Sequence, residues 1–239
     1  MASRANGSSA SEYGEVPAGC WTTAAIDPEA DLKGVNLVFG YGSLCWKPPC
    51  AEEHIVRAFP AKVKGFLRRF WQFSHDHRGT PDSPGFVVVL LRSDHPDINH
   101  ASSKGLVQDG EIEECVGMCY EIRNVEEVLG PLHFREKNGY TATVTTVYSA
   151  EHAKEEGKAI VYFTLPGNDP TYSGPLQESL IAERIAKSIG PSGRNDEYLF
   201  NLSQWLQDNN IRDHHIESLA ELVRALQREG EKVEEEVEK

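Results

Sequence analysis

A turn bracketed by two glycines is the first stretch of the chain that could do chemistry. Residues 35–39 are apolar except for Asn36 and predict a short buried strand, which leads into Gly40-Tyr41-Gly42-Ser43. Glycine tolerates positive φ and lets a ligand approach the backbone closely, so the pair predicts an exposed turn. Successive N–H groups in such a turn attract anionic oxygens, and Ser43 adds a hydroxyl. A plain strand-to-loop turn remains the alternative.

Glu136 is the carboxylate that the sequence best places as a general base. It falls in the last turn of a helix predicted from Asn124, immediately before the C-cap pair Asn138-Gly139. Partial negative charge at that end of a helix raises the pKa of a glutamate towards the range that a general base needs. Arg135 and Lys137 point about 100° away on either side, so they need not neutralise the carboxylate. The alternative is a solvated glutamate in a charged surface turn.

Other kinds of site find little support in the sequence. Ser43 lacks the second glycine of a Gly-x-Ser-x-Gly elbow, so nucleophilic catalysis is not expected. The chain has no P-loop, no complete Gly-x-Gly-x-x-Gly fingerprint and no His-Glu-x-x-His, so we expect no cofactor. His75-Asp76-His77 and the Cys45/Cys50 pair have no further ligand at zinc-site spacing, so we expect a hydrogen-bonded loop and no metal.

Composition excludes several classes of protein. With 24 basic and 37 acidic residues, the formal net charge of −13 makes nucleic acid and anionic membranes poor partners. The longest apolar run, Phe86–Leu91, is far too short to span a bilayer, and the first 15 residues have no apolar signal-peptide core. Five cysteines fit a reducing compartment, so we expect a cytoplasmic protein. Basic residues among aromatic ones are interpreted as a solvated strand face rather than an RNA surface; they are Lys62, Lys64, Arg68 and Arg69.

One folded domain must position these residues. Residues 1–33 predict a flexible leader, residues 34–227 a single domain, and residues 228–239 an acidic tail. A polar surface excursion is predicted at 93–113. Runs of β-prone residues predict strands at 56–66, 66–74, 86–92, 114–122, 141–149 and 159–165.

Helices are predicted between and after these strands. Asn124 and Glu127 form a capping-box pattern, and Gly130-Pro131 should kink or interrupt the helix that carries Glu136. From Pro175 onward, apolar residues recur at helical spacing in three stripes. Many strands followed by helices indicate an α+β fold whose mixed or antiparallel sheet closes toward a barrel.

Five separated segments of the chain, taken together, carry a resemblance to a known protein family. They are Val38-Phe39-Gly40-Tyr41-Gly42-Ser43-Leu44, Arg68-Arg69-Phe70-Trp71-Gln72, Asp76-His77-Arg78-Gly79-Thr80-Pro81, Phe134-Arg135-Glu136-Lys137-Asn138-Gly139-Tyr140, and Gly190-Pro191-Ser192-Gly193-Arg194-Asn195 through Glu197-Tyr198-Leu199. In this order they resemble the ChaC-type, glutathione-specific γ-glutamylcyclotransferases over roughly residues 36–206. A Tyr-Gly-Ser turn alone would be weak evidence, because related cyclotransferase-like barrels share it.

The resemblance implies a small mixed β-barrel of the γ-glutamylcyclotransferase type with flanking helices. It also implies cleavage of glutathione to 5-oxoproline and cysteinylglycine without a cofactor. After the glycine turn and Glu136, the next candidates for substrate contacts are Arg78 and Tyr198, although Tyr198 could equally belong to the helix core. In that family a glutamate matching Glu136 is the acid/base and the glycine turn cradles the γ-glutamyl group, here through Val38, Phe39, Gly40, Tyr41, Gly42, Ser43 and Leu44.

Physical chemistry agrees with these roles. The α-amine of the substrate attacks its own γ-carbonyl, closes a five-membered ring and expels the cysteinyl amine. The attacking amine is largely protonated near pH 7, so Glu136 would take its proton and return it to the leaving nitrogen. Because the attack is intramolecular, the main task of the protein is to fold the γ-glutamyl arm into reach. Backbone N–H groups of the turn would hold either the α-carboxylate or the developing oxyanion.

Two other functions fit the same residues. One is a cyclotransferase that acts on other γ-glutamyl amino acids or amines. The other is a non-catalytic barrel that binds a γ-glutamyl group or a protein partner, although such a module has no need of a base like Glu136. Cys45 stands where an aliphatic residue is expected, and a thiol beside the pocket would be open to oxidation.

Overall fold

A closed five-stranded barrel forms one half of the molecule. The computed structural model describes residues 24–108, 114–136, 139–165 and 171–237. The strand order β7-β3-β6-β2-β8 closes on itself because β7 also pairs with β8. The pairing of β2 with β8 is parallel and the other barrel pairings are antiparallel, so the sheet is mixed. The strands are β2 (Leu37–Gly40), β3 (Ile55–Lys64), β6 (Glu114–Ile122), β7 (Thr141–Ser149) and β8 (Glu155–Phe163).

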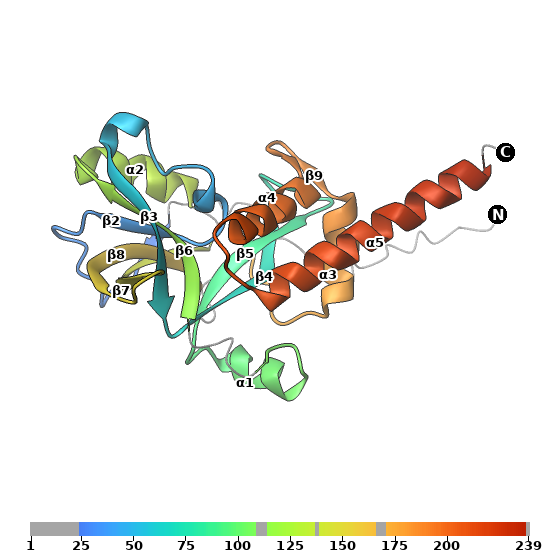
Figure 1. The fold of residues 1–239 in the computed structure, drawn as a ribbon, viewed down its shortest axis with the longest axis horizontal. Helices are drawn as coiled ribbons and strands as arrows, with labels where there is room; N and C mark the ends of the chain where they lie inside the picture. Colours follow the sequence, from blue (N-terminus) through green and yellow to red (C-terminus); the bar gives the residue numbers. More distant parts are fainter. Residues whose placement is uncertain (1–23, 109–113, 137–138, 166–170, 238–239) are drawn as a thin grey trace, which may run out of the picture.

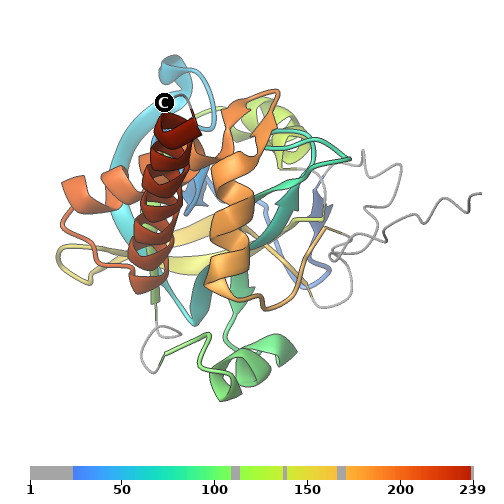
Figure 2. The same cartoon turned by 90° about the vertical axis from the view of Figure 1, so that its right-hand side faces the viewer.

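A hairpin and three helices form the other half (Figure 1). Gly65, at φ +73, separates β3 from β4 and directs the chain out of the barrel sheet. The hairpin strands β4 (Phe66–Ser74) and β5 (Gly85–Arg92) pair with each other. The helices α3 (Glu178–Lys187), α4 (Asn195–Asp208) and α5 (His214–Val237) contact one another, with α3 and α5 side by side in Figure 2.

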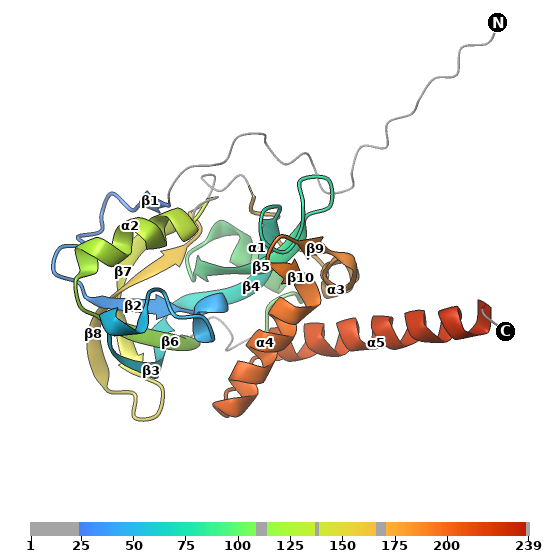
Figure 3. The same ribbon diagram turned by 90° about the horizontal axis from the view of Figure 1, so that it is seen from above.

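The helices form where apolar residues recur every three or four positions, as the sequence predicts. The apolar face of α5 buries Ile216, Leu219 and Val223. In the neighbouring hairpin, β5 buries the four consecutive residues 88–91. Beyond that core α5 projects away from the rest of the chain (Figure 3). No helix among the described residues combines the length and the apolar composition needed to cross a membrane.

Short elements complete the fold and hold the connections. The segment expected to be a surface excursion contains α1, which buries Ile98 and Ala101. The helix that carries Glu136 is α2. The remaining elements are β1 (Ala25–Ile26), the 3₁₀ turns η1 (Ser43–Cys45) and η2 (Glu52–His54), α1 (Pro96–Ser103), α2 (Val125–Arg135), β9 (Ile189–Gly190) and β10 (Gly193–Arg194).

The α+β barrel with flanking helices is confirmed, but both predicted ends of the domain differ. Ala24 is buried and β1 pairs with β7, so folded structure begins before residue 34. The rest of the predicted leader, residues 1–23, lies outside the described residues. At the other end, α5 continues to Val237 into the predicted acidic tail.

Helix α2 also departs from its predicted start and interior. Asn124 adopts a left-handed conformation at φ 55 and makes no side-chain cap, so the capping box is wrong. Pro131 lies inside a helix that runs without interruption from Val125 to Arg135. Burial of Val128 and Leu132 against the barrel offsets the hydrogen bond that the proline cannot donate. The predicted C-cap falls partly outside the described residues, which omit 137–138.

Candidate active site

A cavity of about 270 Å³ opens between the barrel and the hairpin. An inner recess of about 40 Å³ is lined by the glycine turn, which we define as residues 40–44. Ser43, Glu136, Tyr140 and Tyr198 line both spaces, so the recess adjoins the cavity. The cavity is further lined by Lys47, Gln72, Phe73, Ser74, Asp76, His77, Arg78, Val87, Arg135 and Ser192.

The glycine turn is buried, contrary to the exposed turn that we predicted. Neither Gly40 nor Gly42 has positive φ; both are needed because other groups approach them closely. A Cβ on Gly40 would lie 2.1 Å from Leu44 Cβ, and one on Gly42 would lie 2.6 Å from the Tyr198 hydroxyl. The turn therefore requires glycine for space rather than for backbone freedom.

All five residues of the glycine turn line the recess. Phe39 is fully buried and Leu44 nearly so, and both also border the recess. Val38 is buried in the core around α2 and lines neither space, so the structure does not bring its side chain to the site. In the described part of the chain, the N–H groups of Gly42 and Ser43 donate to no backbone carbonyl. These two donors are free to bind an anionic oxygen.

Glu136 is the C-cap residue of α2, and its side chain is 19% exposed. Burial raises its pKa above the ordinary glutamate value, partly offset by the positive charge of Arg135. The predicted direction is confirmed, with burial as the main cause. The negative charge of Glu136 in turn helps to raise the pKa values of Tyr41, Tyr162 and Tyr198, for which burial is the main cause. The carboxylate thus lies among tyrosines.

Arg135 faces the site, which corrects the prediction that it points away from Glu136. Its Nε lies 3.4 Å from Glu136 Oε1, and its Nη2 donates to Ser43 Oγ at 2.9 Å. A third bond reaches the carbonyl of Pro48 at 3.3 Å. Because α2 ends at Arg135, the following residue leaves the helical path and the two side chains can converge. Arg135 thereby fixes the distance between the candidate base and the glycine turn.

Tyr198 belongs both to the core and to the cavity wall. Its ring packs edge-on against Trp46 and Phe70, with centroids 5.4 and 5.8 Å away. Tyr140 lies beside it and donates its hydroxyl to the carbonyl of Val88 at 2.8 Å. Tyr198 can therefore be a core residue and still reach a ligand in the cavity. Its contact with the substrate is a proposal.

Arg78 lines the cavity, and its guanidinium also binds the segment before α4. Its Nη1 donates to the carbonyl of Arg194 at 2.7 Å and lies 3.4 Å from Glu197 Oε2. The amide of Asn195 exchanges two bonds of 2.7 Å with the backbone of Phe86 on β5. The Arg78 contacts join the segments around residues 76–81 and 190–199, which lie far apart in the sequence, and the Asn195 bonds attach the second segment to β5.

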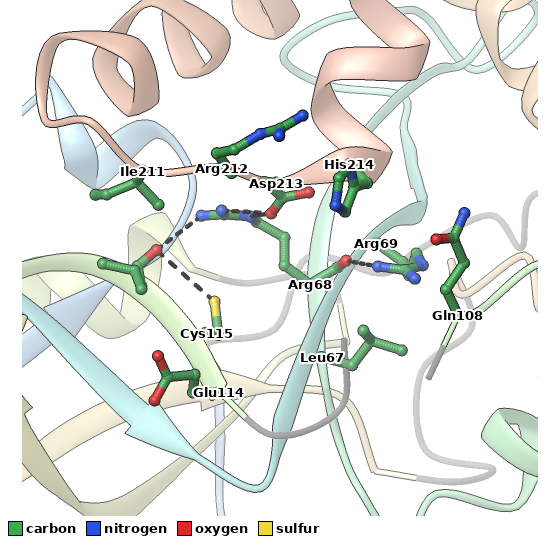
Figure 4. A pocket seen from close by; sticks show the side chains of 11 residues that line it. Leu67, Arg68, Arg69, Gln108, Glu114, Cys115, Ile211, Arg212, Asp213 and His214 are labelled. Atoms are coloured by element: carbon green, nitrogen blue, oxygen red, sulfur yellow. Dashed lines mark hydrogen bonds and ion pairs between the residues drawn. The ribbon is translucent and has the colours of Figure 1, made fainter. Parts of the chain in front are cut away.

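Arg68 links the glycine turn to the segment before α5, and Figure 4 shows it beside Asp213 in the lining of a second cavity. Arg68 is 3% exposed and Arg69 is buried as well, so the interpretation of a solvated strand face is wrong for both arginines, whereas Lys64 is exposed as predicted. The guanidinium of Arg68 pairs with Asp213 at 2.6 Å and donates to the carbonyl of Tyr41 at 2.9 Å. A third partner is the carbonyl of Val116. The ion pair joins the start of α5 to the turn, and this second cavity has a volume of about 340 Å³.

Two other predictions concern cysteine and metal chemistry. Cys45 is 3% exposed, and burial raises the pKa of its thiol to about 12, so it is protected rather than open to oxidation. His77 Nδ1 lies 3.0 Å from Ser192 Oγ, as expected of a hydrogen-bonded loop. The described residues contain no group of three or more side chains of the metal-binding types.

Comparison with known proteins assigns the family. The family model of ChaC-like proteins matches residues 36–226. The chain belongs to the ChaC-like family. A glutathione-specific gamma-glutamylcyclotransferase from Saccharomyces cerevisiae is 35% identical over 223 residues, which cover 78% of this chain and 94% of the yeast protein. Gamma-glutamylcyclotransferase 2-3 from Arabidopsis thaliana is 34% identical over 203 residues, which cover 82% of this chain and 92% of the plant protein.

A solved structure confirms the fold of this ChaC-like chain. The crystal structure of the γ-glutamylcyclotransferase specific to glutathione from yeast matches with a TM-score of 0.67 at 33% identity. The match covers 79% of this chain and 95% of the yeast chain. The γ-glutamylcyclotransferase-like barrel predicted from the five segments is therefore confirmed.

Several residues of the site escaped the sequence analysis. Lys47, Tyr140 and Arg135 line the cavity, and Tyr162 lines the recess. Arg135 and Tyr140 lie within a segment that the resemblance had marked, and Lys47 follows shortly after another, so their positions gave a usable signal. Tyr162 comes from β8, where an aromatic residue in an apolar run gives no indication of a site.

Proposed function

We propose that this protein is a glutathione-specific γ-glutamylcyclotransferase, which converts glutathione to 5-oxoproline and cysteinylglycine. The observation that carries the proposal is the arrangement of Glu136, a carboxylate with a raised pKa, beside the two free N–H groups of the glycine turn. Family relatives that share about a third of its residues over most of its length carry the same activity in their names. The protein is thus an enzyme of this type.

The reaction needs a base and a fixed substrate conformation. The γ-glutamyl arm lies in the recess, where the turn N–H groups of Gly42 and Ser43 hold an anionic oxygen. Glu136 takes a proton from the α-amine, whose nitrogen then forms a bond to the γ-carbonyl carbon. The amide bond to cysteine breaks as Glu136 returns the proton to the leaving nitrogen. The new ring nitrogen also gives up its surplus proton, which the released amine takes up as it becomes an ammonium group. All atoms of the substrate appear in the two products, so no water is consumed.

Other site residues have supporting roles in this proposal. Arg135 holds Glu136 near the turn while moderating its pKa, and Tyr198 limits the space above Gly42. Arg78 contacts the substrate from the cavity wall. We also propose a reducing compartment such as the cytoplasm, since the described cysteines are all free.

The test is to incubate the purified protein with glutathione and to measure 5-oxoproline and cysteinylglycine. We expect both products in equal amounts, with no glutamate. Gamma-glutamyl-alanine is the comparison substrate, because the name of the plant relative does not specify glutathione. Turnover of γ-glutamyl-alanine without turnover of glutathione would favour the broader cyclotransferase, and turnover of neither would favour a binding module.

A further inference from the structure

The cations that line the cavity differ in how far their charge is already used. Arg135 is engaged with Glu136 and Ser43, and Arg78 is engaged with Glu197. Lys47 is exposed at the rim, and its Nζ forms no ion pair with any described residue. Its charge is therefore available to a ligand in the cavity.

The backbone of Lys47 is held close to the candidate base. Its N–H donates to the carbonyl of Ser43 at 2.8 Å at the end of η1. Ser43 contacts Arg135, which in turn contacts Glu136, so the root of the lysine is linked to the base through two side-chain contacts. The four-carbon stem leaves the ammonium group free to reach across the cavity mouth.

The remaining charges around the cavity restrict where a second anion could bind. Asp76 also lines the cavity, and its carboxylate lies 3.8 Å from His77 Nε2. Glu136 occupies the inner end. Both carboxylates repel an anionic group, whereas Lys47 attracts one at the rim.

Glutathione has such a second anion, and this inference rests on the proposed function. With the γ-glutamyl arm in the recess, cysteinylglycine extends outwards for two residues, about 7 Å at most, and ends in the glycine carboxylate. We propose that Lys47 binds this carboxylate and so favours glutathione over γ-glutamyl substrates that carry no charge there. The residue thereby determines specificity without taking part in the chemical step.

The test compares glutathione with its C-terminal amide, which lacks only the charge of the glycine carboxylate. Lys47→Ala should raise KM for glutathione about fivefold, as expected for loss of a partly exposed ion pair, and leave kcat near the wild-type value. The same substitution should change KM for the amide by less than twofold. Lys47→Glu should raise KM for glutathione further and make the amide the better substrate. Lys187→Ala is the matched control, because Lys187 is an exposed lysine of α3 that lines none of the cavities described above.

Each outcome decides between defined alternatives. An equal rise of KM for glutathione and the amide, or no rise for either, would overturn the role of Lys47 while leaving the cyclotransferase intact. If the wild-type protein forms no 5-oxoproline from glutathione, the proposed function fails first, and the inference fails with it. Added salt should reduce the difference between the two substrates in the wild type and not in Lys47→Ala.

Discussion

Replacing Gly42 by alanine should damage the site and the fold together. The new Cβ would lie 2.6 Å from the Tyr198 hydroxyl and 2.7 Å from Val88 Cγ2, whereas ordinary contacts begin at 3.4 Å. Each neighbour must therefore retreat by about 0.7–0.8 Å. Val88 is a buried, β-branched residue of β5, and the Tyr198 ring is packed between aromatic side chains, so neither moves without cost.

The expected magnitude follows from these displacements. Overpacking of this kind costs about 1–3 kcal/mol of the free energy of unfolding. For a domain of about 200 residues, each kcal/mol lowers Tm by about 2–4 °C. Misplacement of a substrate-holding group by nearly 1 Å can cost about 100-fold in rate. We therefore expect Gly42→Ala to fold, to melt several degrees lower, and to lose most of its kcat on glutathione.

The assay measures kcat, KM and Tm of the variant together with two comparison proteins. Gly230→Ala is the control, because its Cβ meets no atom within 4 Å on the exposed end of α5. Adding Tyr198→Phe to Gly42→Ala removes one of the two clashing atoms and should restore part of the lost Tm. A wild-type kcat and Tm in Gly42→Ala would refute the close approach of Tyr198 and Val88 to Gly42. A lower Tm with a wild-type kcat would show that the turn does not hold the substrate.

Three further predictions concern Arg68, Glu136 and Cys45. Arg68→Lys keeps a charge for Asp213 but cannot also hold the carbonyl of Tyr41, so kcat should fall about tenfold, with a smaller change in KM. A wild-type kcat in Arg68→Lys would contradict this. Burial raises the pKa of Glu136 in the folded state, so its stabilising effect is present at low pH and lost as pH rises through that pKa. Glu136→Gln should accordingly raise Tm at pH 8 and show no gain at pH 4, as thermal melts across this range would reveal. In native protein, iodoacetamide should modify Cys45 far more slowly than Cys50, because burial raises the pKa of Cys45 to about 12; equal rates in peptide mass spectra would argue against a protected thiol.

Local patterns in the sequence predicted most of the fold. The β-branched run of β7 and the helical spacing of apolar residues in α5 fix the type of each element over its own length. Helix α1 was missed because only Ile98 and Ala101 of its eight residues are buried, which leaves almost no periodic signal. The interruption predicted at Pro131 was wrong, because the packing of α2 against the barrel outweighs one missing hydrogen bond.

The candidate site was predictable only where a motif marked it. The resemblance identified Glu136 and the glycine turn, and the structure brings them to one recess. The burial of Arg68 depends on Asp213, which lies 145 residues away, so no local pattern could reveal it. The contact between Arg135 and Glu136 arises because α2 ends between them, whereas ideal helix geometry points neighbouring side chains apart.

The central claim is that Glu136 moves the proton that allows the α-amine to attack. The most direct measurement is turnover of glutathione by Glu136→Gln under saturating substrate, with glutathione binding measured by calorimetry on the same sample. Glutamine keeps the size of the side chain and one acceptor oxygen, but it cannot accept the proton. We predict a folded protein that binds glutathione with near wild-type affinity and forms no detectable 5-oxoproline. Turnover close to the wild-type rate would contradict the claim.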